Sequence, residues 1–408
     1  MSTPEVQAPL NGIVVVSVEQ AIAAPLATRQ LADLGATVIK VEPRQGDLAR
    51  HYDSVMSGQS VNFVWVNRGK HSVVLDIREQ RDELRALIAG ADVFVHNLAP
   101  DSASRAGLDV DVLSSQFPSL VVCAISGYGS PGPRSGEKAY DLAIQAEAGA
   151  FSVTGTGDMS KVGFSVADIS AAMNALSGIL AALFRRERTG VGGVVRVSML
   201  ESLTEWMSAP LYGAVYSGEQ PPRTGRRHHS IAPYGTFDLA DGSTVLLAVQ
   251  TDADWRRLAV DVLGRSDLAD DARFESNPDR IRHVRELEGM VADALIAVDS
   301  GILRRRLRES RIAHAGVNDL ASVWSHEQLR ARGRFVDVRT PSGPVEVLKS
   351  ALEIDGHSGG AGAVPGLGEH DPDVVGEVRR SGAVALGQID PNEHNDGSDD
   401  LHRGEHLS

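Results

Sequence analysis

Two β-branched runs separated by one apolar helix open the chain and constrain its fold more than any other feature. Residues 12–19 read GIVVVSVE, residues 25–34 read PLATRQLADL and residues 36–43 read ATVIKVEP. The first and last runs predict buried strands, and Gly35 fits the glycine that commonly follows a helix C-terminus. Because short connections join strand, helix and strand, the pattern predicts a parallel sheet covered by helices.

Further apolar runs follow this first unit. Residues 71–77, 91–100 and 120–133 each predict another strand, because each run is short and is followed by turn or loop residues. No G-x-G-x-x-G sequence follows the first strand, so the glycine fingerprint of dinucleotide dehydrogenases is missing. The predicted fold class is α/β, with a large domain built on a Rossmann-like parallel sheet and a smaller α+β domain.

The character of the sequence changes after residue 218. A polar, proline-rich break (EQPPRTGRR) is followed by an alternating stretch that predicts a β-hairpin with its turn at Asp241 and Gly242, and then by helical patterns. The predicted organisation is a large domain at 1–218, a linker at 219–227, a small domain at 228–325, a segment returning to the large domain at 326–386, and a disordered acidic tail at 387–408.

Composition excludes several classes of function. The 408 residues carry a formal net charge of −14, which argues against a broad nucleic-acid surface. Cys123 is the only cysteine, so no intrachain disulfide is possible, which fits a reducing compartment. The segment MSTPEVQAPLNG resembles no signal peptide, and we expect no uninterrupted apolar run long enough to span a bilayer. We expect a cytoplasmic protein without a membrane partner.

Motifs of hydrolases and metalloenzymes are missing. The chain contains no G-x-S-x-G sequence, which argues against an α/β-hydrolase, and no H-E-x-x-H sequence. His228 and His229 are adjacent, so they cannot share a helical face as a metal pair would. We expect no metal site, and we interpret the two histidines as the edge of a polar linker.

Residues 140–188 carry the strongest candidate for chemistry. A helical run, a loop with Gly155, Gly157 and Gly163, and a long apolar helix follow one another. Asp168 stands among small and apolar residues at the predicted start of that helix, where it fits an N-cap. The cap and the helix dipole would keep the carboxylate ionised, and an ionised carboxylate is a usable nucleophile. The alternative is that Asp168 is only a cap.

The sequence of this stretch resembles that of the family III CoA-transferases, the CaiB/BaiF group that includes the formyl-CoA and carnitine enzymes. The matching segments are YDLAIQAEAG, the glycine-rich loop, KVG and VADI, together with LADLGATVIKVEP and NRGK nearer the N-terminus. The resemblance implies a large CoA-binding domain and an interlocked homodimer. It also implies that Asp168 attacks an acyl-CoA thioester.

The same resemblance implies which residues hold coenzyme A. They are Gln20, Arg44, Asn97, Leu98, Arg105, Lys138 and Tyr140. Taken alone, each basic residue would be interpreted as a solvated surface charge. The chain departs from the family pattern in two places: Pro43 stands where a basic residue is common, and RRHHSIAPYG replaces the glycine run of the formyl-CoA type.

The predicted function is transfer of coenzyme A from an acyl-CoA thioester to a small carboxylic acid through a mixed anhydride and an aspartyl-CoA thioester. Coenzyme A is then substrate and product, and no cofactor is permanently bound. The sequence motifs are most similar to those of mesaconyl-CoA transferases, and they do not identify the acyl donor or the acceptor. One alternative is a 2-methylacyl-CoA racemase, whose catalytic His position is occupied by Tyr140. Another is a CoA-binding protein without turnover.

Overall fold

The computed structural model describes residues 7–355, 359, 361–373 and 376. The chain divides into two compact units, which are described separately. The first takes in Met1–Ile125, Ala172–Arg196 and Asp337–Ser408, and the second takes in Ser126–Ala171 and Val197–Val336. The domain limits predicted from the sequence stay a prediction, and the predicted acidic tail at 387–408 lies outside the described residues.

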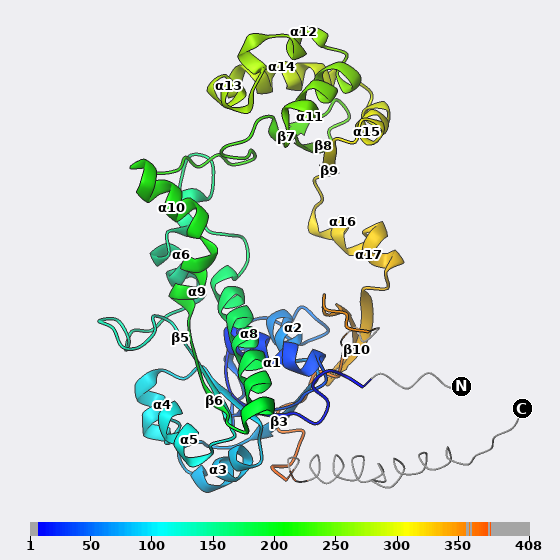
Figure 1. Ribbon diagram of the computed structural model, residues 1–408. Coiled ribbons are helices and arrows are strands. Elements are labelled where there is room, and N and C mark those ends of the chain that lie inside the picture. Colours follow the sequence, from blue (N-terminus) through cyan, green and yellow to red (C-terminus); the bar gives the residue numbers. More distant parts are fainter. Residues whose placement is uncertain (1–6, 356–358, 360, 374–375, 377–408) are drawn as a thin grey trace, which may run out of the picture. The chain divides into compact units, whose positions relative to one another are not determined.

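A six-stranded sheet forms the centre of the first unit (Figure 1). Its order is β3-β2-β1-β4-β5-β6, and β1 pairs in parallel with β2 and β4, β2 with β3, and β4 with β5. The strands are β1 (Val14–Val18), β2 (Thr37–Glu42), β3 (Lys70–Val74), β4 (Val93–His96), β5 (Val121–Ser126) and β6 (Gly193–Ser198). The parallel α/β fold predicted from the sequence is confirmed.

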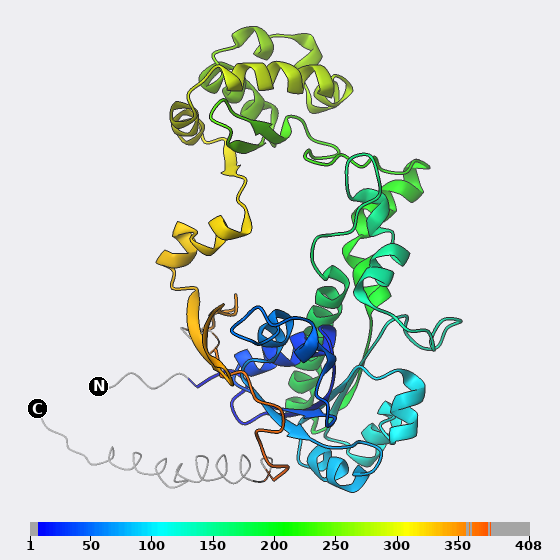
Figure 2. The same cartoon turned by 180° about the vertical axis from the view of Figure 1, so that it is seen from behind.

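Helices cover both faces of this sheet, as Figures 1 and 2 show from opposite sides. The helices of the unit are α1 (Ala23–Asp33), η1 (Leu48–His51), α2 (Val61–Asn67), α3 (Arg81–Ala89), α4 (Pro100–Ala106) and α5 (Val110–Gln116). Leu84 and Leu87 of α3 and Leu113 of α5 pack with Phe94 of β4 in one buried apolar cluster. Burial on both faces explains why these strands read as continuous apolar runs.

The longest helix of the described chain, α8 (Val166–Thr189), spans the boundary between the units. By length and mean hydropathy it qualifies as a candidate membrane span, although Asp168, Ser170 and Asn174 interrupt its apolar sequence. Half of its most apolar window is buried. Ala171, Ala172 and Ala175 are fully enclosed, as in a helix that packs inside a globular core.

A hairpin and the segment after it complete the first unit. Strands β10 (Phe335–Thr340) and β11 (Gly343–Leu348) form a two-stranded sheet. Further along the chain, Ala363 accepts a hydrogen bond from the backbone N–H of Gly69 over 2.8 Å, and the N–H of His370 donates to the carbonyl of Ser72 over 3.0 Å. These bonds attach the late segment to the sheet around β3.

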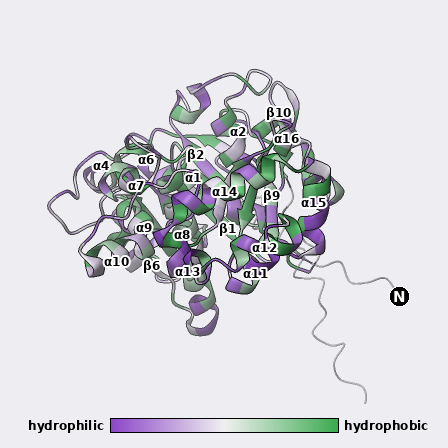
Figure 3. Cartoon of the chain, turned by 90° about the horizontal axis from the view of Figure 1, so that it is seen from above, coloured by the Kyte–Doolittle hydropathy of each residue, from purple (hydrophilic) through white to green (hydrophobic). Residues whose placement is uncertain are grey.

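The second unit holds shorter elements. Its helices are α6 (Asp141–Glu147), α7 (Ala150–Val153), α9 (Met199–Trp206), α10 (Ser208–Ser217), α11 (Asp252–Arg257), the π-helix η2 (Leu258–Val262), α12 (Ser266–Ala269), η3 (Ala272–Phe274), α13 (Asn277–Arg282), α14 (Val284–Ile296), α15 (Ser300–Glu309), α16 (Leu320–Trp324) and α17 (Glu327–Ala331). Leu303 and Leu307 of α15 are buried, and its ribbon alternates between purple and green in Figure 3, as expected of an amphipathic helix.

An antiparallel sheet of three strands packs against α14 and α15 of this unit. Strands β7 (Tyr234–Asp238), β8 (Thr244–Ala248) and β9 (Ala313–Gly316) lie in the order β7-β8-β9. The hairpin predicted around Asp241 and Gly242 is confirmed, with Phe237 opposite Val245 and Gly242 at a φ of 80°. Trp255, Phe274 and neighbouring apolar side chains pack into one buried cluster beside this sheet.

Candidate functional site

Asp168 lies in the first turn of α8, and it is not the cap of that helix. The helix begins at Val166, which places Asp168 at its third residue. Within the described part of the chain, its carboxylate accepts no hydrogen bond. The prediction that Asp168 caps the helix was therefore wrong.

The cap comes from Asp141, at the first residue of α6. Its Oδ1 accepts hydrogen bonds from the backbone N–H of Ala167 over 2.8 Å and of Asp168 over 3.3 Å. A carboxylate that accepts these N–H groups meets the positive end of the helix dipole and holds the start of α8 in place. The two acidic side chains consequently lie close together.

Gln145, one helical turn after Asp141, connects the cap to the preceding loop. Its side chain is almost fully buried, and its Nε2 donates to Oδ2 of Asp141 over 2.7 Å and to the carbonyl of Phe164 over 3.3 Å. Its Oε1 accepts the N–H of Val162 over 2.9 Å. One amide thus ties α6 to the residues that lead into α8.

Burial, and to a smaller extent the negative charge of Asp141, together raise the pKa of Asp168 to about 7. The expectation of a fully ionised carboxylate, drawn from a cap that Asp168 does not provide, is corrected accordingly. Near neutral pH this carboxyl group is divided between its two protonation states. Perturbed groups of this kind cluster at functional sites.

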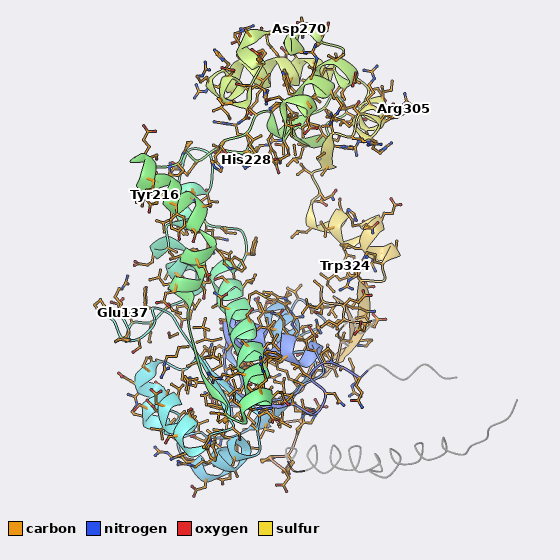
Figure 4. All side chains as sticks on the ribbon, in the orientation of Figure 1. Glu137, Tyr216, His228, Asp270, Arg305 and Trp324 are labelled. Carbon is orange, nitrogen blue, oxygen red and sulfur yellow. The ribbon has the colours of Figure 1, made fainter. Side chains whose placement is uncertain are left out.

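Tyr140 and Lys138 precede α6 and lie at the surface. Tyr140 is the N-cap residue of α6 and its side chain is 64% exposed, and Lys138 is exposed as well. In the nearby loop Arg134 pairs with Glu137, which Figure 4 labels. Both predicted CoA-binding residues thus belong to the same unit as Asp168 and are open to a ligand.

The glycine-rich loop packs against the segment that the sequence predicts as a linker. The carbonyl of Gly155 accepts the N–H of Gly225 over 2.9 Å, and the carbonyl of Gly157 accepts the Arg223 guanidinium. Gly155 has a φ of 102°, and a Cβ there would lie 2.7 Å from the carbonyl oxygen of Asp158. Only glycine fits this tight loop.

In the first unit, Gln20 and Asn97 contact each other at the point where the direction of strand addition in the sheet reverses. The chain runs outward from β1 through β2 to β3, and outward from β4 on the other side, so β1 and β4 flank the switch point. The N–H of Gln20 donates to Oδ1 of Asn97 over 3.1 Å, and Nδ2 of Asn97 donates to the carbonyl of Gln20 over 2.8 Å. In open α/β sheets, ligands bind at this place.

Three other predicted CoA-binding residues lie in the same unit. Leu98 is half-buried against the apolar cluster under α4, whereas Arg105 on α4 and Arg44 after β2 are exposed. Arg105 donates to Oγ of Ser102 over 3.1 Å. Both guanidinium groups are accessible to a phosphate, and nothing in the structure tests that contact.

Sequence reasoning missed a group of buried charges beside the switch point. Glu19, Lys40, Asp47 and Lys70 are almost fully enclosed and hydrogen-bonded to one another. A signal was present, since Glu19 and Lys40 stand inside or directly after β-branched runs whose other members are apolar. Charged residues at such positions are rarely buried unless they are paired.

A second missed residue is His96, the last residue of β4. Both ring nitrogens are buried without a hydrogen-bond partner among the described residues, and burial lowers the pKa of His96 to about 4. Its ring lies 5.8 Å from that of Phe94. We assign it to the apolar face of the sheet. No group of three or more His, Cys, Asp or Glu residues suited to a metal ion occurs in the described ranges.

Comparison with known proteins identifies the class. The model of CoA-transferase family III matches residues 10–371. A succinate–glutarate CoA-transferase of Agrobacterium fabrum is 31% identical over 395 residues, which cover 92% of this chain and 97% of that protein. A succinyl-CoA:mesaconate CoA-transferase of Haloarcula hispanica is 32% identical over 385 residues, covering 90% and 96%.

A solved structure agrees with these relatives. A CaiB/BaiF family protein from Brucella suis superimposes with a TM-score of 0.80 at 30% identity, covering 91% of this chain and all of that one. The chain belongs to CoA-transferase family III, as its sequence motifs predicted. It is accordingly an enzyme of the type that transfers coenzyme A between an acyl-CoA and a carboxylate.

Proposed function

We propose that the transfer proceeds through covalent intermediates on Asp168. The observation that supports this most is a carboxyl group with a pKa near 7, held at a helix start by backbone bonds to Asp141, inside the family's most specific motif. A carboxylate of raised pKa is more basic than an ordinary one, and is therefore the better nucleophile once it is ionised.

The proposed reaction has four steps. An Asp168 oxygen attacks the donor thioester carbonyl, which forms a mixed anhydride and releases CoA thiolate. The thiolate attacks the aspartyl carbonyl of this anhydride, giving an aspartyl-CoA thioester and releasing the donor carboxylate. The acceptor carboxylate attacks the aspartyl thioester, which forms a second mixed anhydride and again releases CoA thiolate. The thiolate then attacks the acceptor acyl carbonyl of this anhydride, which yields the new acyl-CoA and restores the Asp168 carboxylate.

The surroundings of Asp168 favour the first step in this proposal. Acylation converts a partly buried anion beside Asp141 into a neutral anhydride, so the repulsion between the two carboxylates is relieved as the bond forms. The anhydride and the thioester are comparably activated, so no ATP is needed. Backbone N–H groups of the loop around Gly155 and Gly163 are the proposed donors to the oxyanion.

We assign coenzyme A to the residues named by the family resemblance. In the first unit these are Gln20, Arg44, Asn97, Leu98 and Arg105, and in the second they are Lys138 and Tyr140. The place of Gln20 and Asn97 at the switch point of the sheet supports the assignment, because nucleotides bind there in related α/β folds. The exposed Arg105 and Lys138 are suited to phosphate groups.

For the substrates, we propose a dicarboxylic acyl donor such as succinyl-CoA and a small dicarboxylic acceptor. The support is that two relatives carry succinate, glutarate or mesaconate in their names. We further propose a cytoplasmic homodimer. Helix α10 supports the dimer because it contains no buried residue, and Leu211, Val215 and Tyr216 are 41%, 66% and 87% exposed (Figure 4).

The covalent route can be tested directly. Succinyl-CoA without an acceptor should load the protein, and hydroxylamine should then mark one peptide, the one that contains Asp168, as seen by mass spectrometry. Asp168→Asn should show neither the mark nor transfer. A mark on a different residue, or transfer by Asp168→Asn at the wild-type rate, would show that the covalent proposal is wrong.

Racemisation of a 2-methylacyl-CoA is the second candidate, because a carboxylate with a pKa near 7 also suits a general base. Against it, Tyr140 stands where a racemase has its histidine, and a phenol is a poor base at neutral pH. Incubation with a 2-methylacyl-CoA in deuterated water should therefore give little α-deuterium. Rapid exchange at that carbon would favour the racemase.

A further inference from the structure

The loop between β1 and α1 is held by side chains from β2 and from the segments that follow β2 and β4. It runs from Glu19 to Ile22, at the carboxyl end of β1. Nζ of Lys40, on β2, donates to the carbonyl of Glu19 over 3.2 Å, and Oδ1 of Asp47 accepts the N–H of Ala21 over 3.0 Å. Asn97 binds both backbone polar groups of Gln20 between them.

Lys40 and Asp47 act together in these contacts. Nζ of Lys40 lies 2.7 Å from Oδ2 of Asp47, and neither side chain has any exposed surface. A buried ion pair contributes little net stability compared with an apolar pair of the same size. Both members of the pair nevertheless bind the backbone of the β1–α1 loop, and these two bonds fix the conformation of that loop.

A second pair supports the first from behind. Nζ of Lys70, on β3, donates to Oε1 of Glu19 over 2.7 Å and to the carbonyl of Pro25 in the first turn of α1 over 2.9 Å. Thr28 of α1 donates to both oxygens of the Glu19 carboxylate. The first loop residue, Glu19, and the first turn of α1 are thereby joined through buried charges.

The backbone inside the loop is strained. Ala21 has a φ of 62°, in the left-handed region that residues with a Cβ rarely adopt. Such a conformation persists only where its surroundings determine it, and strained residues concentrate at ligand sites. The neighbouring Gln20 is exposed, whereas Glu19 and Ile22 on either side are buried.

We infer that Lys40 and Asp47 are positioning residues that force the β1–α1 loop into its strained form, so that Gln20 is presented to the acyl-CoA. The inference rests on the proposed function and adds two residues to it. A merely structural pair would support the sheet without selecting a backbone conformation at the switch point. The observed contacts select one at Glu19 and at Ala21.

The test uses a charge-neutral double variant, Lys40→Met with Asp47→Leu, which removes the acceptor for the N–H of Ala21 and leaves no unpaired charge from this pair in the interior. The matched control is Arg186→Met with Asp92→Leu. That pair is also mostly buried, and it binds the N–H of Val14 at the opposite end of β1. Lys40→Met with the smaller Asp47→Ala is the second variant, for use where the first does not fold.

We expect the Lys40/Asp47 variant to raise KM for succinyl-CoA about ten- to hundredfold and to lower kcat by less. The reason is that a misplaced Gln20 weakens substrate binding more than the chemical steps. Amide exchange at Ala21 should become faster. The control should unfold at lower temperature but keep the wild-type KM. An unchanged KM in a folded Lys40/Asp47 variant, with Leu or with Ala at position 47, would overturn the inference. Absence of any succinyl-CoA binding by the wild-type enzyme would instead remove the proposed function.

Discussion

Two carboxyl groups with different tasks lie at the start of α8. Asp141 accepts backbone N–H groups and holds the helix, while Asp168 accepts none among the described residues and has a raised pKa. Environment separates the two roles, because one carboxylate is satisfied by hydrogen bonds and the other is desolvated beside a like charge. The proposed nucleophile is thus more basic because it has lost hydration and gains no hydrogen bonds in exchange.

Asp141→Asn should separate the charge of Asp141 from its capping role. The amide oxygen can still accept the N–H of Ala167, but the negative charge beside Asp168 is gone. The pKa of Asp168 should fall, and the acid limb of kcat/KM against pH should move down by about one unit. The shift is partial because burial, the larger cause of the raised pKa, remains.

The matched control for this experiment is Glu147→Gln, since Glu147 is an exposed carboxylate on the same helix. It should leave the pH profile in place. A profile that is identical for Asp141→Asn and the wild type would mean that the two carboxylates do not interact.

Asp168→Asn should change stability in a pH-dependent direction. The folded-state pKa lies near 7, above the ordinary 3.8, so the folded protein binds more protons than the unfolded chain between these values. The free energy of unfolding of the wild type should therefore fall as pH rises from 4 to 7. The variant has no such group. Between pH 4 and pH 8 the free energy of unfolding of the wild type should therefore fall by about 2–4 kcal/mol relative to that of the variant.

Urea unfolding at both pH values measures this difference, and a transfer assay on the same samples should show a loss of about three orders of magnitude or more. If Asp168→Asn were equally or less stable than the wild type at pH 8, relative to pH 4, the buried-charge account would be wrong. A simple N-cap predicts a loss of about 1 kcal/mol and retained activity.

The sequence identified Asp168 through its motif but assigned the wrong local role. Helix-start rules consider neighbours within a few residues, and the actual cap, Asp141, comes from a different helix. The pKa of Asp168 depends on tertiary burial, which no local pattern contains. The motif was therefore a better guide to the important residue than to its physical state.

At the scale of elements, the order of the strands explains where ligand-binding groups lie. The βαβ pattern predicted a parallel sheet because the chain has no other short way to bury two adjacent apolar runs. The end of the third run was less predictable: residues 71–77 were expected to form a strand, whereas β3 ends at Val74. Asp76 then accepts the N–H groups of Glu79 and Gln80 in a turn that ends the extended chain.

The same topology leads to a prediction for α4, which follows the Asn97 loop. Arg105→Ala should weaken CoA binding by about 1–3 kcal/mol, because a charge-assisted bond to phosphate is lost. The helix should stay folded, since the guanidinium is exposed and bonds only to Ser102 through its side chain among the described contacts. Calorimetry with CoA measures the affinity.

Arg85→Ala supplies the control for that measurement. Arg85 is an exposed cation on the neighbouring helix α3, outside the segments that match the family's CoA site. It should bind CoA like the wild type. Equal affinity in Arg105→Ala and Arg85→Ala, with both proteins folded, would remove Arg105 from the CoA site.

At the scale of the whole molecule, the exposed apolar residues of α10 are the feature that a single chain leaves unexplained. The helix carries Leu211, Tyr212, Val215 and Tyr216 at its surface, with no buried residue in its ten. A helix of this composition normally buries one face. This exposure could not be predicted from the sequence, because an apolar helix that packs within its own chain and one that a second chain covers have the same sequence pattern.

We expect a second copy of the chain to cover α10, and Tyr212→Asp with Tyr216→Asp to disrupt that contact. Two carboxylates placed in an apolar interface lose hydration without gaining partners, so the dimer should dissociate at concentrations where the wild type remains associated. Sedimentation equilibrium measures the change. Both side chains are more than half exposed in the single chain, so the folded monomer should persist with an unchanged circular dichroism spectrum. A wild type that sediments as a monomer, or a variant that stays dimeric, would show that α10 is not the interface.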